Sequence, residues 1–264
     1  MAASSTPFRR SLAIQSRVIG ALLMREIITR YGRHNIGVLW IIVEPMLFTL
    51  AISGLWSLGD LHAFGGIPVI GFGITGYSSV VIWRNATNRC SSAIEPNLGL
   101  MHHRNVKVID IFISRVLLEI IGATASITVL TIFFATIGAM QWPQDIMLIL
   151  CGWLLLCWLA FAMGCFVGVV SEYWKFFGRV WRVVNHILFA VSGTFYMVDW
   201  LPRDLQTASL LLPMVHGVEM VRHGYFGQLV PTHEDPTYFV MANLFLTLVG
   251  LALVRVSERK GYNK

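Results

Sequence analysis

The sequence contains 264 residues, of which 56% are hydrophobic and only 13% are charged. Soluble domains carry about 25% charged residues and about 45–50% apolar ones. The composition therefore excludes a water-soluble enzyme, together with disordered, fibrous and disulfide-rich proteins, and it predicts a polytopic membrane protein. The net charge of +6 is compatible with a polyanionic partner. It can equally report membrane topology, which the distribution of the basic residues decides.

Residues 16–33 form the first distinctive segment, ahead of any apolar stretch of spanning length. Apolar residues recur there at helical spacing, with polar residues on the opposite face. The apolar face comprises Leu23, Met24, Ile27, Ile28 and Tyr31, and the polar face comprises Arg25, Glu26, Thr29, Arg30 and Arg33. We predict an amphipathic helix in the membrane interface, with an ion pair between Glu26 and Arg30. It serves either as a topological anchor or as a lever on which a partner pushes.

Six apolar stretches reach or approach the length of about 20 residues that a helix needs to cross a bilayer. They cover residues 36–58, 67–83, 116–140, 146–170, 180–198 and 238–254. Helices are expected because isolated strands would leave backbone groups unpaired in lipid. The predicted fold class is an all-α polytopic membrane protein with six transmembrane helices. Its parts are a cytoplasmic N-terminus (1–35), a transmembrane domain (36–256) and a cytoplasmic tail (257–264).

The Lys and Arg residues are distributed very unevenly among the connecting segments. Eighteen of the 20 fall in the N-terminus, in residues 84–115, in the connection into the fifth stretch and at the C-terminus. Only Arg203 and Arg222 fall in the alternate connections. Because basic loops stay in the cytoplasm, both termini are predicted to be cytoplasmic. The positive charge is then chiefly a topology signal, and we expect no nucleic-acid partner.

The connection between the second and third stretches, residues 84–115, is longer than a compact membrane protein requires. Residues 91–98 predict a short helix broken by Pro96. The adjacent His102 and His103 are potential metal ligands, but a solvated basic turn is favoured because further ligands are missing at coordinating spacing. The length of the connection favours a docking segment for a cytoplasmic partner. The candidate docking residues are Glu95, Asn97, His102, His103 and Arg104.

Between the fifth and sixth stretches, residues 208–215 form an apolar run that is too short to cross a bilayer and is interrupted by Pro213. Such a run predicts a re-entrant or interfacial hairpin on the outer side of the membrane. The polar residues that follow suggest an outer gate with a polar lip. Simple pairing on one helix face is the alternative. The candidate gate residues are His216, Glu219 and Arg222.

Ionisable residues inside apolar stretches are costly and usually face a cavity or a partner helix. Glu44 lies in the first stretch and His186 in the fifth, and each shares a helical face with aromatic and small residues. Two such faces suit a path for a bulky, hydroxyl-rich molecule such as a sugar chain, whereas helix packing is the alternative. The candidate path residues are Trp40, Glu44, Phe48, Arg84, Arg182, His186, Phe189, Phe195 and Tyr196.

Four sequence blocks occur in a characteristic order between residues 16 and 256. They contain Arg25-Glu26-Ile27 with Glu44-Pro45, Ala93-Ile94-Glu95 with Asn105-Val106-Lys107, Ser192-Gly193-Thr194-Phe195-Tyr196, and Pro213-Met214-Val215-His216-Gly217. In this order the chain resembles the bacterial polysaccharide-export permeases of the ABC transporter superfamily. The resemblance is closest to the capsular polysaccharide (polysialic acid transport) permeases. One departure is Leu212, where the family pattern has asparagine before the proline.

The resemblance implies a permease in the bacterial inner membrane that works as a homodimer with two separate ATP-binding subunits. Those subunits would bind ATP and Mg, and this chain contains no GxxxxGK[ST] phosphate loop. The substrate would be a lipid-linked, often acidic glycan, passed to a periplasmic polysaccharide export adaptor. The first cytoplasmic connection would dock the ATPase, and spans one and five would enclose the canal. We expect no cofactor, metal or catalytic residue in this chain.

Three other functions are alternatives to this one. An O-antigen or teichoic-acid export permease of the same superfamily is the main alternative. A membrane-embedded enzyme would need acid–base groups at one depth, whereas Glu44 and His186 lie near the cytoplasmic side and Glu219 lies outside. A stand-alone channel or secondary carrier is disfavoured by the long docking connection and by the absence of an internal repeat.

Overall fold

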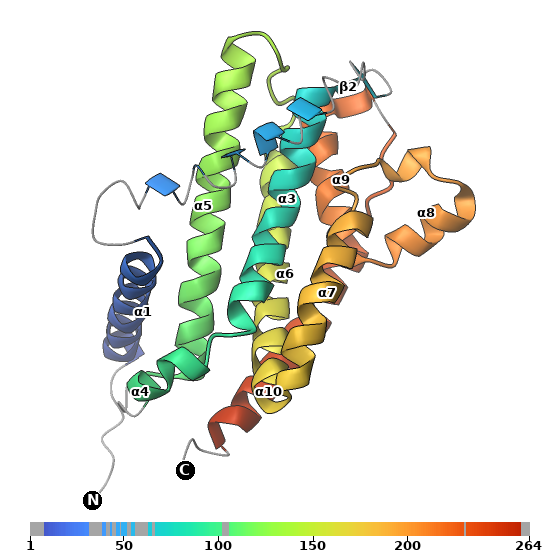
Figure 1. The fold of residues 1–264 in the computed structure, drawn as a ribbon. Helices are drawn as coiled ribbons and strands as arrows, with labels where there is room; N and C mark the ends of the chain where they lie inside the picture. The colour runs from blue at the N-terminus through green and yellow to red at the C-terminus, as the bar shows by residue number, and fades with distance from the viewer. Residues whose placement is uncertain are drawn as a thin grey trace, which may run out of the picture.

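The computed structural model of the protein describes residues 8–31, 39–40, 43, 46–47, 49–51, 54–55, 63–64, 67–101, 106–229 and 231–259. Within these ranges the chain is mostly helical (Figure 1). The long helices are α1 (Phe8–Tyr31), α3 (Val69–Cys90), α5 (Val108–Thr136), α6 (Ile146–Tyr173), α7 (Lys175–Val191) and α10 (Pro236–Arg259). Helices α3, α5, α6, α7, α9 and α10 form a bundle, and α1 lies against the side of α5 (Figure 1).

The shorter elements occupy the two ends of the bundle. Strands β1 (Ala63–Phe64) and β2 (Ile67–Pro68) form a small antiparallel ladder before α3. The turn η1 (Glu95–Asn97) and helix α4 (Leu98–Met101) lie at the opposite end, where α1 begins and α10 ends (Figure 1). The remaining elements, between α7 and α10, are η2 (Val198–Trp200), α8 (Arg203–Leu210), α9 (Pro213–Phe226) and η3 (Gly227–Leu229).

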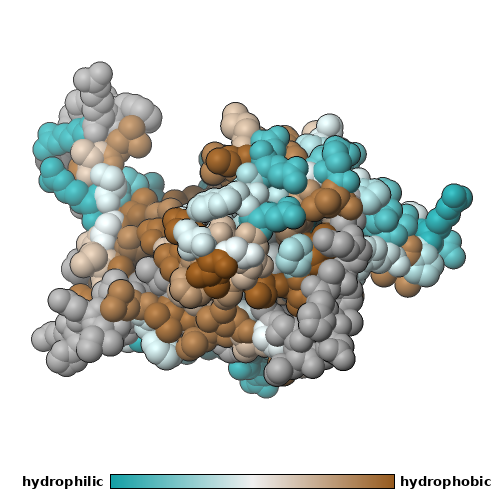
Figure 2. Space-filling view, turned by 90° about the horizontal axis from the view of Figure 1, so that it is seen from above, coloured by the Kyte–Doolittle hydropathy of each residue, from teal (hydrophilic) through white to brown (hydrophobic). Residues whose placement is uncertain are grey.

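Three helices among the described residues, α5, α6 and α10, are long and apolar enough to cross a membrane. The prediction of six spans is therefore only partly confirmed. Helix α3 contains most of the predicted stretch 67–83, and α7 contains the first part of the stretch 180–198. Neither helix is both long enough and apolar enough to be a candidate span. The stretch 36–58 lies mostly outside the described residues. The outer surface of α6 and α10 is nevertheless apolar, with Met147 and Leu248 at least 70% exposed, and apolar areas remain uncovered when the molecule is seen from above (Figure 2).

Helix α3 is less apolar than α5, α6 and α10, and it is buried inside the bundle. It contacts α5, α6, α7 and α9, and nearly all of its residues from Val69 to Trp83 are buried. Small residues permit this close packing. A Cβ atom on Gly76 would lie 2.3 Å from the Arg222 guanidinium, and one on Gly168 of α6 would lie 2.5 Å from the Phe112 ring of α5. These two glycines allow a buried arginine and a buried ring to reach their positions.

Helix α1 differs from the predicted amphipathic helix in length and in its contacts. It begins at Phe8 rather than at residue 16. Glu26 and Arg30 do not pair with each other: Glu26 pairs with Arg115 of α5, and Arg30 pairs with Glu119 of α5. Met24, on the predicted apolar face, is 57% exposed. The prediction missed this arrangement because partners distant in sequence outcompeted the local pair.

Two predicted boundaries shift because helices continue further or end sooner than the apolar stretches do. The connection 84–115 is partly helical, since α3 continues to Cys90 and α5 begins at Val108. Helix α7 ends at Val191, because Gly193 adopts φ +82°, a left-handed conformation that favours glycine. Phe195 and Tyr196 were predicted within the fifth span, and instead lie in the turn after α7.

Helix α9 forms the second arm of a hairpin with α8 and packs along half of α6. A Cβ atom on Gly217 would lie 2.5 Å from the side chain of Leu156, near the middle of α6. At the other end, the Asp145 amide donates to the Gly224 carbonyl at 2.7 Å. Helix α9 therefore runs antiparallel to α6, from its middle to its N-terminal end.

Candidate functional site

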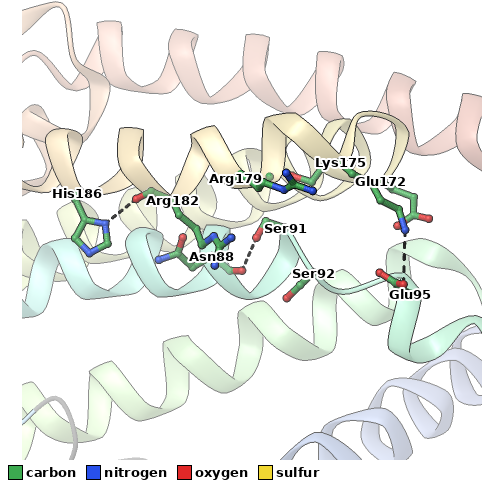
Figure 3. A pocket seen from close by; sticks show the side chains of 11 residues that line it. Asn88, Ser91, Ser92, Glu95, Glu172, Lys175, Arg179, Arg182 and His186 are labelled. Carbon is green, nitrogen blue, oxygen red and sulfur yellow. Dashed lines mark hydrogen bonds and ion pairs between the residues drawn. The ribbon is translucent and has the colours of Figure 1, made fainter.

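A polar pocket of about 560 Å³ lies at the end of the bundle where α3 and α6 finish and α7 begins (Figure 3). Most of its charged side chains come from one face of α7, and its hydroxyl and amide groups come from α3, from the turn after α3 and from α6. The lining residues are Asn88, Ser91, Ser92, Glu95, Ser171, Glu172, Lys175, Gly178, Arg179, Arg182 and His186. This volume lies within the usual range for ligand sites.

A sharp reversal between α6 and α7 builds one wall of the pocket. Trp174 is the single residue between the two helices, and its amide donates to the Val170 carbonyl at 2.9 Å. Gly178 then lies beside Ser171, since a Cβ atom there would meet the Ser171 side chain at 3.5 Å. This reversal folds α7 back along the bundle, so its early residues lie beside the last turn of α6.

The sequence of α7 places one row of polar side chains along the pocket. Lys175, Arg179, Arg182 and His186 recur at intervals of three or four residues, so they share one helical face. Trp181 and Asn185 lie on another face and are buried against the bundle. The Asn185 amide donates to the Arg84 carbonyl of α3 at 3.1 Å, which fixes the rotation of α7 about its axis.

The charges in the pocket are only partly compensated. Lys175 and Glu95 form an ion pair at 3.6 Å between side chains that are 70% and 71% exposed. Within the described part of the chain, the Arg179 and Arg182 guanidinium groups have no hydrogen-bonded acceptor or ion-pair partner, and Arg182 extends toward Asn88 (Figure 3). Both arginines are exposed. The pocket is therefore basic at the end near His186, whereas at the other end Lys175 lies beside the carboxylates of Glu95 and Glu172 (Figure 3).

Three further polar atoms are available in the same pocket. The Nδ1 of His186 lies 2.6 Å from the Arg182 carbonyl. Because a carbonyl only accepts, Nδ1 carries a proton, and in the neutral ring Nε2 is left as an acceptor. Ser171 Oγ and Asn88 Oδ1 are buried and have no hydrogen-bond partner among the described residues. Buried polar atoms normally find partners, so these two indicate a place for water or a ligand.

The structure brings some of the predicted path residues together and separates others. Arg182 and His186 line the pocket. Arg84 lies one step further along, with its guanidinium carbon 4.6 Å from the Phe189 ring centroid. Phe195 packs edge-to-face on Phe189, with centroids 5.1 Å apart. Arg84 of α3, Phe189 of α7 and Phe195 of the turn after α7 therefore form a row of contacts beyond the pocket.

The other predicted path residues have less direct positions. Trp40 is about half exposed. The Tyr196 hydroxyl donates to the Val191 carbonyl at 2.6 Å and lies 2.9 Å from Ser209 Oγ. That hydroxyl is thus engaged in holding the turn after α7. Glu44 and Phe48 lie outside the described residues.

Of the predicted docking residues, one is exposed, one is buried and three lie outside the described residues. Glu95 is exposed at the rim of the pocket. Asn97 is buried: its Nδ2 donates to the Ala93 carbonyl at 2.8 Å, and its Oδ1 accepts from Arg25 of α1. Asn97 therefore braces the turn against α1 rather than presenting a surface. His102, His103 and Arg104 lie outside the described residues.

The predicted gate residues do not form an exposed lip, because all three side chains are buried. Arg222 is fully buried and donates to the carbonyls of residues 193, 194 and 196 at 2.6–2.9 Å. Its guanidinium carbon also lies 3.9 Å from the centroid of the Phe72 ring. Arg222 therefore ties the turn after α7 to α9 and α3. Sequence alone did not reveal this, because the acceptors are backbone carbonyls.

His216 and Glu219 hold a second loop against α9. The Asp235 amide donates to Nδ1 of His216 at 2.9 Å, so Nε2 carries the proton and donates to the Leu210 carbonyl at 2.8 Å. The Glu219 carboxylate accepts the His233 amide at 3.3 Å and the Val198 amide at 3.5 Å. These two side chains therefore fix the loops on either side of the α8–α9 hairpin.

A charged cluster between α1, α3 and α5, which we name the α1–α5 clamp, was not predicted from the sequence. Glu119 pairs with Arg30 of α1 and lies 3.6 Å from Arg89 of α3. Arg115 pairs with Glu26 at 3.2 Å. One signal was present in the sequence: Glu119 is an ionisable residue inside the predicted stretch 116–140, where a partner should be expected.

Comparison with known proteins places this chain in a family. A profile of the ABC-2 type transporter family matches residues 17–226. The chain is 45% identical over 249 residues to the capsule polysaccharide export inner-membrane protein CtrC of Neisseria meningitidis, with 94% of each chain covered. It is 44% identical over 250 residues to the capsule polysaccharide export inner-membrane protein BexB of Haemophilus influenzae, covering 95% of this chain and 94% of the relative.

A more distant relative has a related description. The chain is 28% identical over 250 residues to the polysialic acid transport protein KpsM of Escherichia coli, covering 95% of this chain and 97% of the relative. The similarity therefore extends over nearly the whole of both chains. Because the family profile and these relatives each cover most of its length, the chain belongs to the ABC-2 type transporter family.

Proposed function

We propose that this protein is the permease subunit of an ATP-driven exporter that moves lipid-linked capsular polysaccharide across the bacterial inner membrane. The observation that carries the proposal is identity of 43–45% to capsule polysaccharide export inner-membrane proteins over at least 94% of each chain. The more distant relative is also described as transporting a polysaccharide. These relatives favour capsular polysaccharide over an O-antigen or a teichoic acid.

The partners and topology belong to the same proposal. Two copies of the chain would pair with two ATP-binding subunits, which hold the ATP and Mg, and with a periplasmic export adaptor. Six helices would cross the membrane within residues 36–256, with both termini in the cytoplasm. The antiparallel course of α5, α6 and α7 supports this topology, as does the position of the start of α1 near the end of α10 (Figure 1). The α8–α9 hairpin would enter the outer half of the membrane, and α1 would lie in the inner interface.

The basic pocket would receive the glycan from the cytoplasm, together with an aromatic row formed by Phe189 of α7 and Phe195 of the turn after it. Arg182, His186 and Arg84 supply hydrogen-bond donors and acceptors, while Phe189 and Phe195 supply ring faces and edges on which sugars pack. Trp40, Glu44 and Phe48 of the first span would face this row across the canal. The two copies would rock when the ATPase closes and pushes on the η1–α4 turn and on α1, which Asn97 and Arg25 connect.

Deletion and complementation test the function. A strain lacking this reading frame should lose the surface glycan and accumulate it inside the cell, and the intact protein should restore export. Affinity purification of the tagged permease should also recover an ATP-binding subunit. Normal surface glycan in the deletion strain, or loss of a different envelope glycan, would overturn the proposal.

Charge reversal at the pocket rim tests ATPase docking. Glu95→Lys should leave the protein in the membrane but uncouple ATP hydrolysis from export, if Glu95 contacts the ATPase. The matched control combines Glu95→Lys with Lys175→Glu, which restores the ion pair in reversed order. If docking requires Glu95, the double variant stays defective. Recovery of export by the double variant would instead show that only the ion pair mattered.

A further inference from the structure

Helix α7 presents two exposed stripes side by side. The basic stripe, defined by Lys175, Arg179, Arg182 and His186, faces the pocket. The second, which we name the apolar stripe, lies about 100° further around the helix. It consists of Phe176, Val180, Val183 and Ile187, all of them exposed. An amphipathic ligand whose charged and apolar parts adjoin each other fits such a pair of stripes.

The basic stripe has the donors that a phosphate group requires. Arg179 and Arg182 lie three residues apart on one helical face, and neither has an acceptor among the described residues. Guanidinium groups bind phosphate oxygens through paired hydrogen bonds. The Ser171 hydroxyl, which is buried in the wall of the same pocket and has no partner in the described part of the chain, adds a further donor. The pocket thus gathers donors at one end without a protein carboxylate to satisfy them.

The apolar stripe distinguishes a phosphate on a lipid from a carboxylate on a sugar. A sugar carboxylate within a glycan is surrounded by hydroxyl groups and carries no hydrocarbon to cover Val183 and Ile187. A lipid phosphate has its hydrocarbon only a few bonds away. The volume of about 560 Å³ leaves space beside the arginines for a polar headgroup. Glu95 and Glu172, at the far end of the pocket, leave the anion nearest to Arg179 and Arg182 (Figure 3).

We propose that the pocket between α3, α6 and α7 binds the phosphate of a lipid headgroup through Arg179 and Arg182, with the hydrocarbon lying along the apolar stripe of α7. Two lipids supply this chemistry: the lipid that carries the exported glycan and an ordinary anionic phospholipid. Assignment to the glycan's own lipid rests on the proposed function. Binding of a lipid phosphate does not rest on it, so the two claims fail separately.

Lipid binding to the purified full-length permease tests the site. Dissociation constants for phosphatidylglycerol and for zwitterionic phosphatidylcholine would be measured by native mass spectrometry from detergent. The intact protein should prefer phosphatidylglycerol, and Arg179→Gln with Arg182→Gln should weaken its binding about tenfold while phosphatidylcholine changes little, since two charge-assisted contacts are lost. Arg179→Lys with Arg182→Lys should recover part of the affinity, because it keeps the charge and loses the paired geometry.

A matched control separates the site from general electrostatic attraction. Arg255 is an exposed arginine on α10, near the same end of the bundle. Arg255→Gln should leave the dissociation constant for phosphatidylglycerol within about twofold, because exposed charges outside the pocket contribute only screened attraction. An equal loss for Arg255→Gln, or no loss for the Arg179 and Arg182 pair, would overturn the proposal. Thermal unfolding of each variant shows that the fold is retained.

Lipids that co-purify from cells identify the source of the phosphate. If the site holds the glycan's lipid, the Arg179 and Arg182 variant should lose co-purified glycolipid and export, with phosphatidylglycerol unchanged. If it holds a phospholipid, phosphatidylglycerol should be lost, even from cells that cannot synthesise the glycan. The second result supports the lipid-phosphate site and rejects its role in substrate binding. Absence of both effects rejects the site.

Discussion

Two groups of arginines lie at the same end of the molecule but have opposite surroundings. In the α1–α5 clamp, Arg30 and Arg115 pair with carboxylates, and Glu119 is only 7% exposed. In the pocket, Arg179 and Arg182 are exposed and have no carboxylate partner among the described residues. A buried charge without a partner is strongly destabilising, whereas an exposed one is tolerated. The clamp arginines are therefore expected to hold the fold, and the pocket arginines to be available to a ligand.

The two groups of arginines differ because the charged faces of α1 and α5 pack against each other, whereas the charged face of α7 does not pack against the bundle. Helix α1 lies along α5, so their charged faces meet and pair. Helix α7 turns its uncharged residues Trp181 and Asn185 toward the bundle, which leaves its basic face open. Arg222 resembles the clamp arginines in being held by protein groups, but it is completely buried and donates to three backbone carbonyls. Substitutions of the clamp residues and of Arg222 should therefore mainly lower stability, whereas substitutions of the pocket arginines should mainly lower transport.

The largest expected loss of stability is at Arg222. Arg222→Met leaves the carbonyls of residues 193, 194 and 196 without their donor and Glu219 without its nearby cation, so the free energy of unfolding should fall by about 3–5 kcal/mol. Circular dichroism of the detergent-solubilised protein during heating measures the change. Arg222→Lys is the matched control: it keeps the charge, loses the forked geometry and should be intermediate. A stability of Arg222→Met equal to that of the intact protein would show that the buried arginine does not hold the turn.

A smaller loss is expected when the clamp is broken at Glu119. Glu119→Gln removes the charge that faces Arg30 and Arg89, and should cost about 1.5–3 kcal/mol. Hydrogen exchange should rise in α1 more than in α6, because α1 depends on these contacts. Glu26→Gln is the control, since Glu26 is more exposed than Glu119 and its loss should cost less. Equal exchange in α1 before and after Glu119→Gln would mean that apolar contacts alone secure the helix.

Substitution of a pocket arginine should lower transport while changing stability very little. Arg182→Gln should change the free energy of unfolding by no more than about 0.5 kcal/mol, because an exposed side chain without a partner contributes little. Export of the surface glycan should nevertheless fall. Quantification of surface glycan at equal permease abundance measures the effect, and Arg255→Gln serves as the control. A variant that is destabilised as strongly as Glu119→Gln would remove the distinction between the two groups.

The sequence predicted the features that depend on local periodicity. Arg182 and His186 were expected on one face of a helix, and both line the pocket. A hairpin was expected from an apolar run broken by Pro213, and the structure has a turn there, between the end of α8 and the start of α9 (Figure 1). Whether the hairpin enters the membrane remains a prediction. Polar residues that recur at helical spacing can be recognised in a single sequence, because their position on one face does not depend on which other segment packs against the helix.

Features that depend on distant partners could not be predicted in this way. Glu26 was paired with Arg30, four residues away, whereas its partner is Arg115 on another helix. Arg222 was placed at an exposed gate, since no side-chain spacing reveals that its acceptors are carbonyls in the turn after α7. The early end of α7 depends on the left-handed conformation of Gly193. Each miss follows from a tertiary contact that outweighs a local pattern.

The smallest expected effect concerns the one ion pair described within the pocket. Lys175 and Glu95 are about 70% exposed and 3.6 Å apart, so their attraction is weakened by water and salt. A double-mutant cycle with Lys175→Met and Glu95→Gln should give a coupling energy of about 0.2–0.5 kcal/mol at low salt, falling further at high salt. A coupling energy as large as that of the clamp would show that the pocket is also held by its charges. With a small value, any loss of export in the Glu95 variants has to come from a contact with another molecule.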